Sequence, residues 1–286
     1  MHRRPLNPAA AVLVPACTRA AHSDTRKMAA AALQIYVDAV RRELQRQDPA
    51  VLGIAVSLAV VLLTIVFFIF LRRRRSSRRA VLIVGLCDSG KTLFYCRLLS
   101  GKFKVTQTSI TSNSSPYKVK SDKGPTLHLY DLPGHESLRL QFLEKHKAEA
   151  RAIVFVVDSV SFQKEVKDVA EFLYTLLTDP QIVNNATPLL ISCNKQDVTM
   201  AKSAKLIQQQ LEKEINTLRM IRSAAPSSLD ESGIGSAVPL GKKGKDFDFS
   251  QVPMRVDFVE CSARGNKGED GEADLGIVET WLLKTA

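Results

Sequence analysis

The pattern of apolar and polar residues divides the chain into two unlike parts. Residues 50–71, AVLGIAVSLAVVLLTIVFFIFL, form a run of 22 residues without a charged side chain. A helix of that length reaches about 33 Å, enough to cross a hydrocarbon core of roughly 30 Å. Helices buried in soluble proteins rarely contain so long an apolar stretch. The pattern therefore predicts a single transmembrane helix rather than a buried core helix.

After residue 79, short apolar runs alternate with stretches of helical periodicity. The apolar runs predict β-strands at 80–84, 127–131, 153–158, 189–193 and 256–260. The stretches between and after them predict helices at 91–100, 137–148, 163–177, 201–222 and 274–284. Continuous apolar strands that alternate with helices are typical of a parallel sheet covered on both faces. The predicted fold class is therefore α/β, with a doubly wound, mostly parallel sheet.

One part of this domain lacks the alternating pattern. Residues 223–253 are rich in Ser, Gly, Pro and Lys and have no sustained periodicity, which predicts a flexible insertion with a short extended piece at Phe247–Phe249. The chain is thus expected to comprise a partly disordered N-terminal segment, a transmembrane helix, a basic juxtamembrane linker and an α/β domain, at residues 1–49, 50–71, 72–79 and 80–286.

The distribution of charge fixes an orientation. The formal net charge is +11, but six arginines lie within residues 72–79, and residues 80–286 carry a net charge of only +1. A nucleic-acid-binding domain should carry its positive charge on the folded domain, so direct nucleic-acid binding is not expected. The positive-inside rule places the arginines and the following domain in the cytosol, and the N-terminal segment in the lumen.

The first chemical motif lies between a predicted strand and a predicted helix. Residues 85–92 read GLCDSGKT, which fits the phosphate-binding pattern GxxxxGK[ST] in the context that this pattern requires. Backbone N–H groups of such a loop hold phosphate oxygens, its lysine reaches the β- and γ-phosphates, and its hydroxyl ligates Mg²⁺. The candidate nucleotide-binding residues here are Gly85, Leu86, Cys87, Asp88, Ser89, Gly90, Lys91, Thr92 and Leu93.

A second motif identifies the base. Asn194, Lys195 and Asp197 belong to the sequence NKQD, which directly follows the predicted strand 189–193. The carboxylate of Asp197 can accept two hydrogen bonds from guanine N1–H and N2–H₂, whereas adenine would leave it unpaired. After the last strand come Ser262 and Ala263, where a backbone N–H would contact guanine O6. The predicted ligand is therefore GTP.

A third motif completes the phosphate end. Asp131 ends a predicted strand, where it is placed to hold Mg²⁺ through water, and the N–H of Gly134 can meet a γ-phosphate oxygen. The predicted cofactors are GTP and Mg²⁺.

These motifs, in this order, resemble the Ras-like small GTPases, especially the Arf and Sar branch, over residues 80–286. With the single N-terminal anchor, DLPGHESLR at 131–139 and the insertion at 223–253, the chain most resembles the family of signal recognition particle receptor β subunits. The resemblance implies a subunit of the endoplasmic reticulum membrane that binds GTP and then holds the receptor α subunit there for co-translational targeting. The ribosome and the translocon are further candidate partners.

The chain departs from the Ras-like pattern at two positions. His135 follows the glycine of the DxxG motif, where many Ras-like proteins have a water-orienting glutamine. Two interpretations of His135 stay open: a catalytic residue, or a switch residue used for partner contact. In the first switch, Thr106, Gln107, Thr108 and Ser109 should lie over the nucleotide. A gapless match gives the Mg²⁺-binding position to Ser109, with Thr108 and Thr111 nearby. Both departures favour slow intrinsic hydrolysis.

Two other functions remain as alternatives. An Arf- or Sar-like vesicle-transport GTPase would share the motifs, but such proteins cycle on and off membranes with a small amphipathic or lipid anchor. A static anchor with a vestigial nucleotide site is the other alternative, and the intact motif residues argue against loss of nucleotide binding.

Overall fold

The computed structural model describes residues 56–69, 78–119, 126–224, 238–242, 244–265 and 271–285. The chain divides into two compact units, Met1–Arg72 and Arg73–Ala286. In the first unit, residues 56–69 form a helix with exposed apolar side chains. Within the described ranges, no helix has the length and apolar character needed to cross a membrane. The remainder of the predicted span 50–71, the segment 1–49 and residues 72–77 lie outside the described residues.

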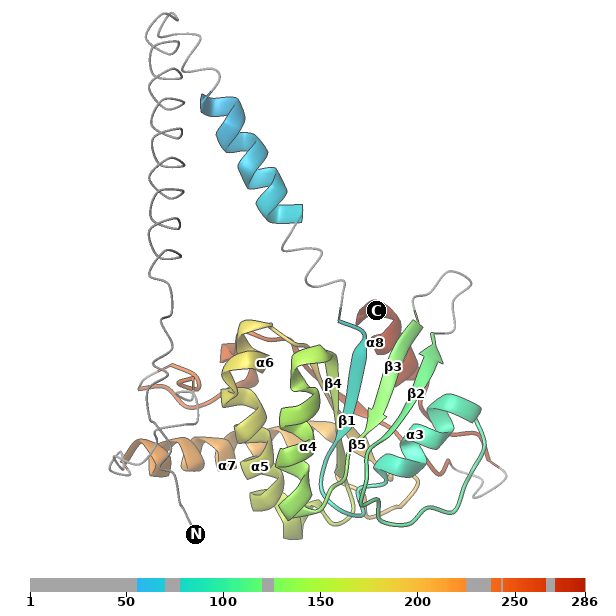
Figure 1. Cartoon of the computed structure of the whole chain (residues 1–286). Coiled ribbons are helices and arrows are strands. Elements are labelled where there is room, and N and C mark those ends of the chain that lie inside the picture. The colour runs from blue at the N-terminus through green and yellow to red at the C-terminus, as the bar shows by residue number, and fades with distance from the viewer. Residues whose placement is uncertain are drawn as a thin grey trace, which may run out of the picture. The chain divides into compact units, whose positions relative to one another are not determined.

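The second unit is built around a six-stranded sheet (Figure 1). The strands are β1 (Ala80–Val84), β2 (Asn113–Lys118), β3 (Thr126–Asp131), β4 (Ala150–Asp158), β5 (Leu189–Asn194) and β6 (Val256–Glu260). Their order across the sheet is β2-β3-β1-β4-β5-β6, and all pairings except β2 with β3 are parallel. Every residue of β1 and β5 is buried, as continuous apolar strands predict. The predicted α/β fold with a mostly parallel sheet is confirmed.

Strand β2 was not predicted from the sequence. Its residues NSSPYK contain no apolar run, and only Tyr117 among them is buried. The strand lies at the edge of the sheet and pairs with β3 alone. Proline is tolerated in such a position because an edge strand has one side without a ladder, and Pro116 pairs there with His128.

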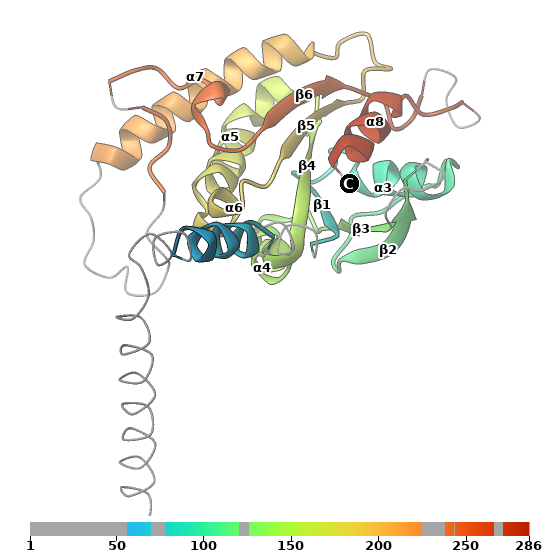
Figure 2. The ribbon, with the colours of Figure 1, turned by 90° about the horizontal axis from the view of Figure 1, so that it is seen from above.

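Helices cover both faces of the sheet (Figure 2). Apolar residues of α3 (Lys91–Ser100) and α8 (Gly276–Thr285) pack on one face. The other face is covered by α4 (Glu136–His146), α5 (Phe162–Thr178), α6 (Pro180–Asn184) and α7 (Ala204–Ala224). Two short 3₁₀ helices, η1 (Lys147–Glu149) and η2 (Phe249–Gln251), complete the domain. The five predicted helices are present: α3 has the predicted bounds and the other four have shifted ends, whereas the short α6 was not predicted.

The structure corrects the flexible insertion predicted at 223–253. Residues 225–237 and Lys243 lie outside the described residues, but the following part packs on the domain. Phe247 and Phe249 are buried. The ring centroid of Phe249 lies 5.2 Å from that of Phe247 and 5.0 Å from that of Phe258 in β6. Within the short extended piece expected at Phe247–Phe249, the backbone of Asp248 is extended, and η2 begins at Phe249. Periodicity did not reveal this segment, because single aromatic side chains rather than a regular pattern of apolar residues pack it against the core.

Candidate functional site

The carboxyl ends of the parallel strands meet at one edge of the sheet, and the loop 85–90 leaves β1 there (Figure 1). Its two glycines have positive φ angles, 146° at Gly85 and 88° at Gly90. A Cβ atom at Gly85 would collide with the carbonyl oxygen of Val156, so this position requires glycine. Between the glycines, Leu86 and Ser89 are buried, whereas Asp88 is exposed and Cys87 half-buried. The sequence spacing GxxxxG therefore reflects a tightly packed loop that has no room for a side chain at its two glycines.

Lys91 opens helix α3 and is only 7% exposed. Its ammonium donates to the carbonyl oxygen of Leu86, so the charge lies inside the loop. Burial lowers the pKa of Lys91, and the nearby carboxylate of Asp131 opposes this effect. A buried cation beside a helix N-terminus forms a site suited to an anion such as phosphate. Leu93, in the first turn of α3, packs against the apolar cluster on that face of the sheet, so its side chain has a structural contact there.

Gly134 closes the loop from the other side. A Cβ atom there would lie 2.5 Å from Lys91 Nζ and 2.8 Å from the carbonyl carbon of Leu86, so the backbone of the DLPG motif lies directly against the phosphate-binding loop. The close approach requires glycine at this position.

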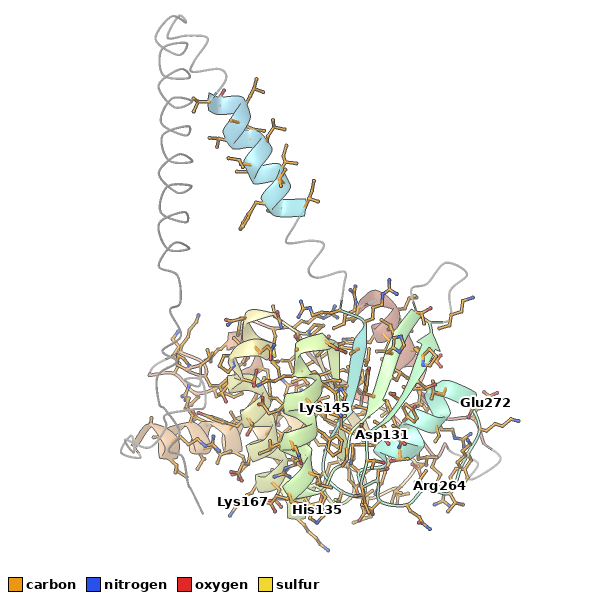
Figure 3. All side chains as sticks on the ribbon, viewed as in Figure 1. Asp131, His135, Lys145, Lys167, Arg264 and Glu272 are labelled. Atoms are coloured by element: carbon orange, nitrogen blue, oxygen red, sulfur yellow. The ribbon has the colours of Figure 1, made fainter. Side chains whose placement is uncertain are left out.

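Asp131 forms the centre of a small polar cluster at the end of β3 (Figure 3). Its Oδ2 accepts hydrogen bonds from Thr92 Oγ1 at 2.9 Å and from Asn113 Nδ2 at 3.4 Å, and Thr92 Oγ1 lies 3.2 Å from Ser109 Oγ. Asp131 is fully buried, and its Oδ1 has no hydrogen-bond partner. Burial raises the pKa of Asp131, although the Thr92 hydrogen bond and the charge of Lys91 oppose this.

These residues fit Mg²⁺. A buried carboxylate with one orphaned oxygen is costly, and a cation beside it would remove that cost. Mg²⁺ is commonly held by one or two carboxylates together with substrate phosphates, rather than by a cage of acidic side chains. In keeping with this, the described part of the chain contains no group of three or more His, Cys, Asp or Glu residues suited to a metal. The hydroxyls of Thr92 and Ser109, which lie 3.2 Å apart, would supply further oxygen ligands to such an ion.

Asn194 joins the two ends of the site. The residue ends β5 and is 2% exposed. Its Nδ2 donates to the carbonyl oxygen of Ser89 at 2.9 Å, and its Oδ1 accepts from the N–H of Ala263 at 2.9 Å. One side chain thus ties the loop 85–90 to the turn that follows β6. The motifs that the sequence separates by more than a hundred residues therefore form one site.

The remaining base-recognition candidates lie beside this bridge. Asp197 Oδ1 accepts a hydrogen bond from Ser262 Oγ at 2.6 Å, and Ser262 Oγ accepts from the N–H of Gly265 at 2.9 Å. Ser262 is thereby fixed, and it orients the carboxylate of Asp197. Asp197 itself is half-buried, so it is open to a ligand on one side.

Lys195 is positioned by an ion pair that the sequence did not reveal. It has a positive φ of 66°, and its Nζ lies 2.6 Å from Asp158 Oδ2 at the end of β4. Burial alone would raise the pKa of Asp158, but hydrogen bonds from Lys195 and from the N–H of Val160 outweigh it and lower the pKa. The sequence did contain a feature that indicates this residue, because Asp158 ends an apolar strand at the same sheet edge as Asn194.

Arg97 is a second residue that the sequence analysis missed. It is 5% exposed, and its guanidinium donates to the carbonyl oxygens of Ala263 at 3.1 Å, Arg264 at 3.0 Å and Gly101 at 2.8 Å. The guanidinium also lies 5.6 Å from the ring centroid of Phe103. Arg97 therefore links the turn after β6 to the start of the segment 101–112. The sequence feature that could have identified Arg97 is a single charged residue within the otherwise apolar helical stretch LFYCRLL.

The first-switch candidates divide into two groups. Ser109 is half-buried and contacts Thr92, whereas Thr106, Gln107 and Thr108 are exposed. Among the described residues, the structure brings none of these three into hydrogen-bond contact with Asp131 or the loop 85–90. Thr111 is likewise exposed.

His135 precedes helix α4 and is exposed, at the same end of the domain as the sheet edge that bears Asp131 (Figure 3). Its Nδ1 lies 2.8 Å from Ser137 Oγ. This contact occupies one ring nitrogen and leaves Nε2 available to a ligand or partner. The geometry does not choose between the catalytic and the partner-contact interpretation.

Comparison with known proteins shows which family this chain matches. The model of the family "Signal recognition particle receptor beta subunit" matches residues 76–256. The signal recognition particle receptor β subunits of Mus musculus and Homo sapiens are 59% and 58% identical to this chain, each over 93% of this chain and 100% of the relative.

Solved structures agree with this result. A chain of "The Structure of the Mammalian SRP Receptor" is 58% identical, covers 73% of this chain and 100% of its own length, and superposes with a TM-score of 0.63. The fold is also shared, at 20% identity and a TM-score of 0.55, by a "Signal recognition particle receptor SRb-GTP/SRX complex from Chaetomium thermophilum". This chain therefore belongs to the family of signal recognition particle receptor β subunits.

Proposed function

We propose that this chain binds GTP with Mg²⁺ and, in the GTP-bound state, holds the signal recognition particle receptor α subunit at the endoplasmic reticulum membrane. The observation that carries the proposal is the bridge made by Asn194, which joins the phosphate-end loop through Ser89 to the base-end turn through Ala263. A GTPase site requires both ends to be held at a fixed separation. Membership of the receptor β-subunit family supports the identity of the partner.

Each residue has a defined part in this proposal. The N–H groups of loop 85–90 and the ammonium of Lys91 hold the phosphates, and the N–H of Gly134 meets the terminal phosphate. Thr92, Ser109 and Asp131 hold Mg²⁺, which neutralises phosphate charge when bound. At the other end, the carboxylate of Asp197 reads guanine.

Switching rather than turnover is the proposed purpose of the site. Loops that contact a terminal phosphate become ordered when it is present and are released without it. The imidazole of His135 contacts Ser137, and this contact does not orient the ring toward the phosphate-binding loop. We therefore propose slow intrinsic hydrolysis, with the GTP-bound state lasting long enough to support assembly.

Residues 50–71 provide the proposed anchor. The helix at 56–69 exposes large apolar side chains, among them Leu63 at 69% and Phe68 at 68%, and the arginines of 72–79 follow it. Such side chains are stable against lipid rather than water. By the positive-inside rule the nucleotide-binding domain faces the cytosol. Contacts with the ribosome and the translocon remain predictions of the family resemblance.

Capture of the α subunit by the detergent-solubilised full chain tests the proposal. The wild-type chain, loaded with a non-hydrolysable GTP analogue or with GDP, should capture the α subunit only in the GTP form. The variant Asp197→Asn should capture it with the xanthosine triphosphate analogue instead, which ties capture to base reading. Equal capture in every nucleotide state would support a static anchor.

An alkaline carbonate wash of microsomes distinguishes the proposed transmembrane anchor from the other alternative, an Arf- or Sar-like GTPase. An integral anchor resists this wash, whereas the lipid or amphipathic anchor of an Arf- or Sar-like protein does not give that resistance. Release of the chain into the supernatant would contradict the proposed anchor.

A further inference from the structure

A hollow lies near the amino end of β1, at the opposite end of that strand from the candidate nucleotide site. It has a volume of about 540 Å³ and is lined by Arg78, Arg79, His128, Tyr130, Glu149 and Asn185, together with two alanines. These residues come from the entry to β1, from β3, from η1 and from the turn between α6 and β5. None of them belongs to the nucleotide motifs.

The wall of the hollow is rich in hydrogen-bond donors. The lining residues carry two guanidinium groups, an imidazole, a phenol and an amide, and one acidic side chain, that of Glu149. The backbone keeps the basic residues together, because the N–H of His128 donates to the carbonyl oxygen of Arg79 at 2.8 Å. Arg78 is tethered beside them through a bond of 3.4 Å to the carbonyl oxygen of Ala150. Arg79 and His128 are exposed and therefore accessible to a ligand.

This donor set is suited to a phosphate group. Guanidinium groups bind phosphate oxygens through paired charge-assisted hydrogen bonds, and the imidazole adds a further donor. The volume exceeds what a single inorganic ion fills, so a phosphate with an organic substituent fits better. Glu149 supplies one acceptor, which complements an ammonium group carried by the same ligand.

The sequence connects the hollow to a membrane surface. The proposed anchor ends at Leu71, and Arg78 follows seven residues later. Seven residues span at most about 25 Å even when fully extended, so the covalent chain holds the amino end of β1 close to the bilayer. The cytoplasmic leaflet carries anionic lipids, which attract basic groups near its surface.

We propose that this hollow binds the headgroup of an anionic phospholipid, with the phosphodiester against Arg78, Arg79 and His128 and the ammonium of a serine headgroup against Glu149. The lipid source rests on the proposed membrane anchor, whereas the phosphate chemistry rests on the hollow itself. Headgroup binding would attach the domain to the membrane surface at a second point, beyond the anchor helix.

Acylation of histidines by diethyl pyrocarbonate tests the proposal in the full chain. The chain is inserted into nanodiscs of phosphatidylcholine, with and without added phosphatidylserine, and the acylation rates of His128 and His135 are measured by mass spectrometry. His135 is also exposed but belongs to the nucleotide end, so it serves as the internal control. Phosphatidylserine should slow acylation of His128 by about threefold, the effect of a site two-thirds occupied, and leave His135 unchanged.

Two variants distinguish a specific site from general attraction to the arginines. Arg79→Gln removes a wall residue and should abolish protection of His128. Arg73→Gln removes the same charge from the linker and should preserve it. Equal loss in both variants, or protection that persists in Arg79→Gln, would overturn the proposal in favour of a general surface effect.

The remaining outcomes identify the source of the phosphate. Soluble glycerophosphoserine or inorganic phosphate, added to phosphatidylcholine discs, should protect His128 far less than the lipid does. Equal protection would overturn the lipid and leave a site for free phosphate. Insertion without protection would overturn the headgroup proposal alone. Failure of the chain to insert would overturn the proposed anchor, and the lipid source with it.

Discussion

The two ends of the candidate nucleotide site are held with different strength. At the base end, hydrogen bonds from Asn194, Ser262 and Arg97 fix the turn after β6 to the loop 85–90, to Asp197 and to helix α3. At the switch end, the described segment from Thr106 to Thr111 has one side-chain hydrogen bond, between Ser109 and Thr92. Ile110 in this segment is 74% exposed, and Val105, directly before the segment, is 86% exposed.

This difference matches two different tasks. Base recognition needs an acceptor-only carboxylate held in place before the ligand arrives, because reorganisation would reduce the affinity gained. A switch needs a segment whose conformation responds to a few new contacts, and local stability is low where buried contacts are few. The base end is therefore expected to be preformed, whereas the switch end should acquire order from the ligand.

Loss of the Arg97 guanidinium should give the largest effect on stability, because its hydrogen bonds hold the base end in place. Arg97→Met leaves three carbonyl oxygens without their donor and should destabilise the folded chain by about 3 kcal/mol. The control is Arg222→Met, which removes a guanidinium that also lies over an aromatic ring, Tyr174, at 4.5 Å but is 45% exposed. That variant should lose under about 1 kcal/mol. Equal losses in denaturant unfolding would show that burial of Arg97 is not what matters.

Arg97 also illustrates what the sequence could not predict. Its acceptors at Ala263 and Arg264 lie 166 and 167 residues away, so no local pattern joins them. By contrast, β1 and α3 have the predicted bounds, because an apolar run and a glycine loop mark their ends locally. Local signals therefore predicted the motif loops, and long-range contacts decided how those loops are tied together.

Two of the segments that the sequence did not predict follow the same rule. Strand β2 is polar and is specified by its pairing with β3, not by its own periodicity. Phe247 packs on Phe249 and Phe249 packs on Phe258, although the composition of this stretch is typical of a flexible loop. Tertiary contacts overrode local preference in both cases.

The second prediction concerns a substitution that should impair base recognition while preserving the hydrogen bonds of the base end. Asp197→Asn keeps an oxygen that can accept from Ser262, but its NH₂ group would oppose guanine N2–H₂. Loss of a charge-assisted bond worth about 1.5–3 kcal/mol should weaken GTP binding by at least about tenfold. Xanthine has a carbonyl at C2, so the variant should prefer xanthosine triphosphate.

Competition binding of the full chain measures this preference. Asp168→Asn, on the exposed surface of α5, is the matched control and should leave the order of the two nucleotides unchanged. Unchanged GTP affinity in Asp197→Asn would mean that Asp197 does not read the base.

The third prediction concerns Asp131, which accepts a hydrogen bond from Thr92 beside the switch end. Because its folded-state pKa is raised, its protonated form favours the folded state, and this contribution is lost as pH rises from the ordinary value near 4 through the raised one. In the chain stripped of Mg²⁺ with EDTA, Asp131→Asn should therefore be more stable than the wild type at neutral pH, by about 1 kcal/mol.

With Mg²⁺ and GTP the order should reverse, because the amide is a poor substitute for a metal-binding carboxylate. Thermal unfolding at several pH values, with and without Mg²⁺, measures both effects. Reduced stability of Asp131→Asn in both conditions would show that the carboxylate is a structural hydrogen-bond acceptor and not a metal ligand.

The smallest effect on stability is expected at the switch end. Ile110→Ser removes an apolar side chain that is 74% exposed, so the free energy of unfolding should change by less than about 0.5 kcal/mol. The same substitution should reduce capture of the α subunit, because an exposed apolar side chain in a segment that responds to nucleotide is suited to partner contact. Met220→Ser, at 63% exposure on α7, is the control for general loss of surface apolarity and should leave capture unchanged. A large loss of stability in Ile110→Ser would mean that the switch end is as firmly held as the base end, and the contrast between the two ends would not stand.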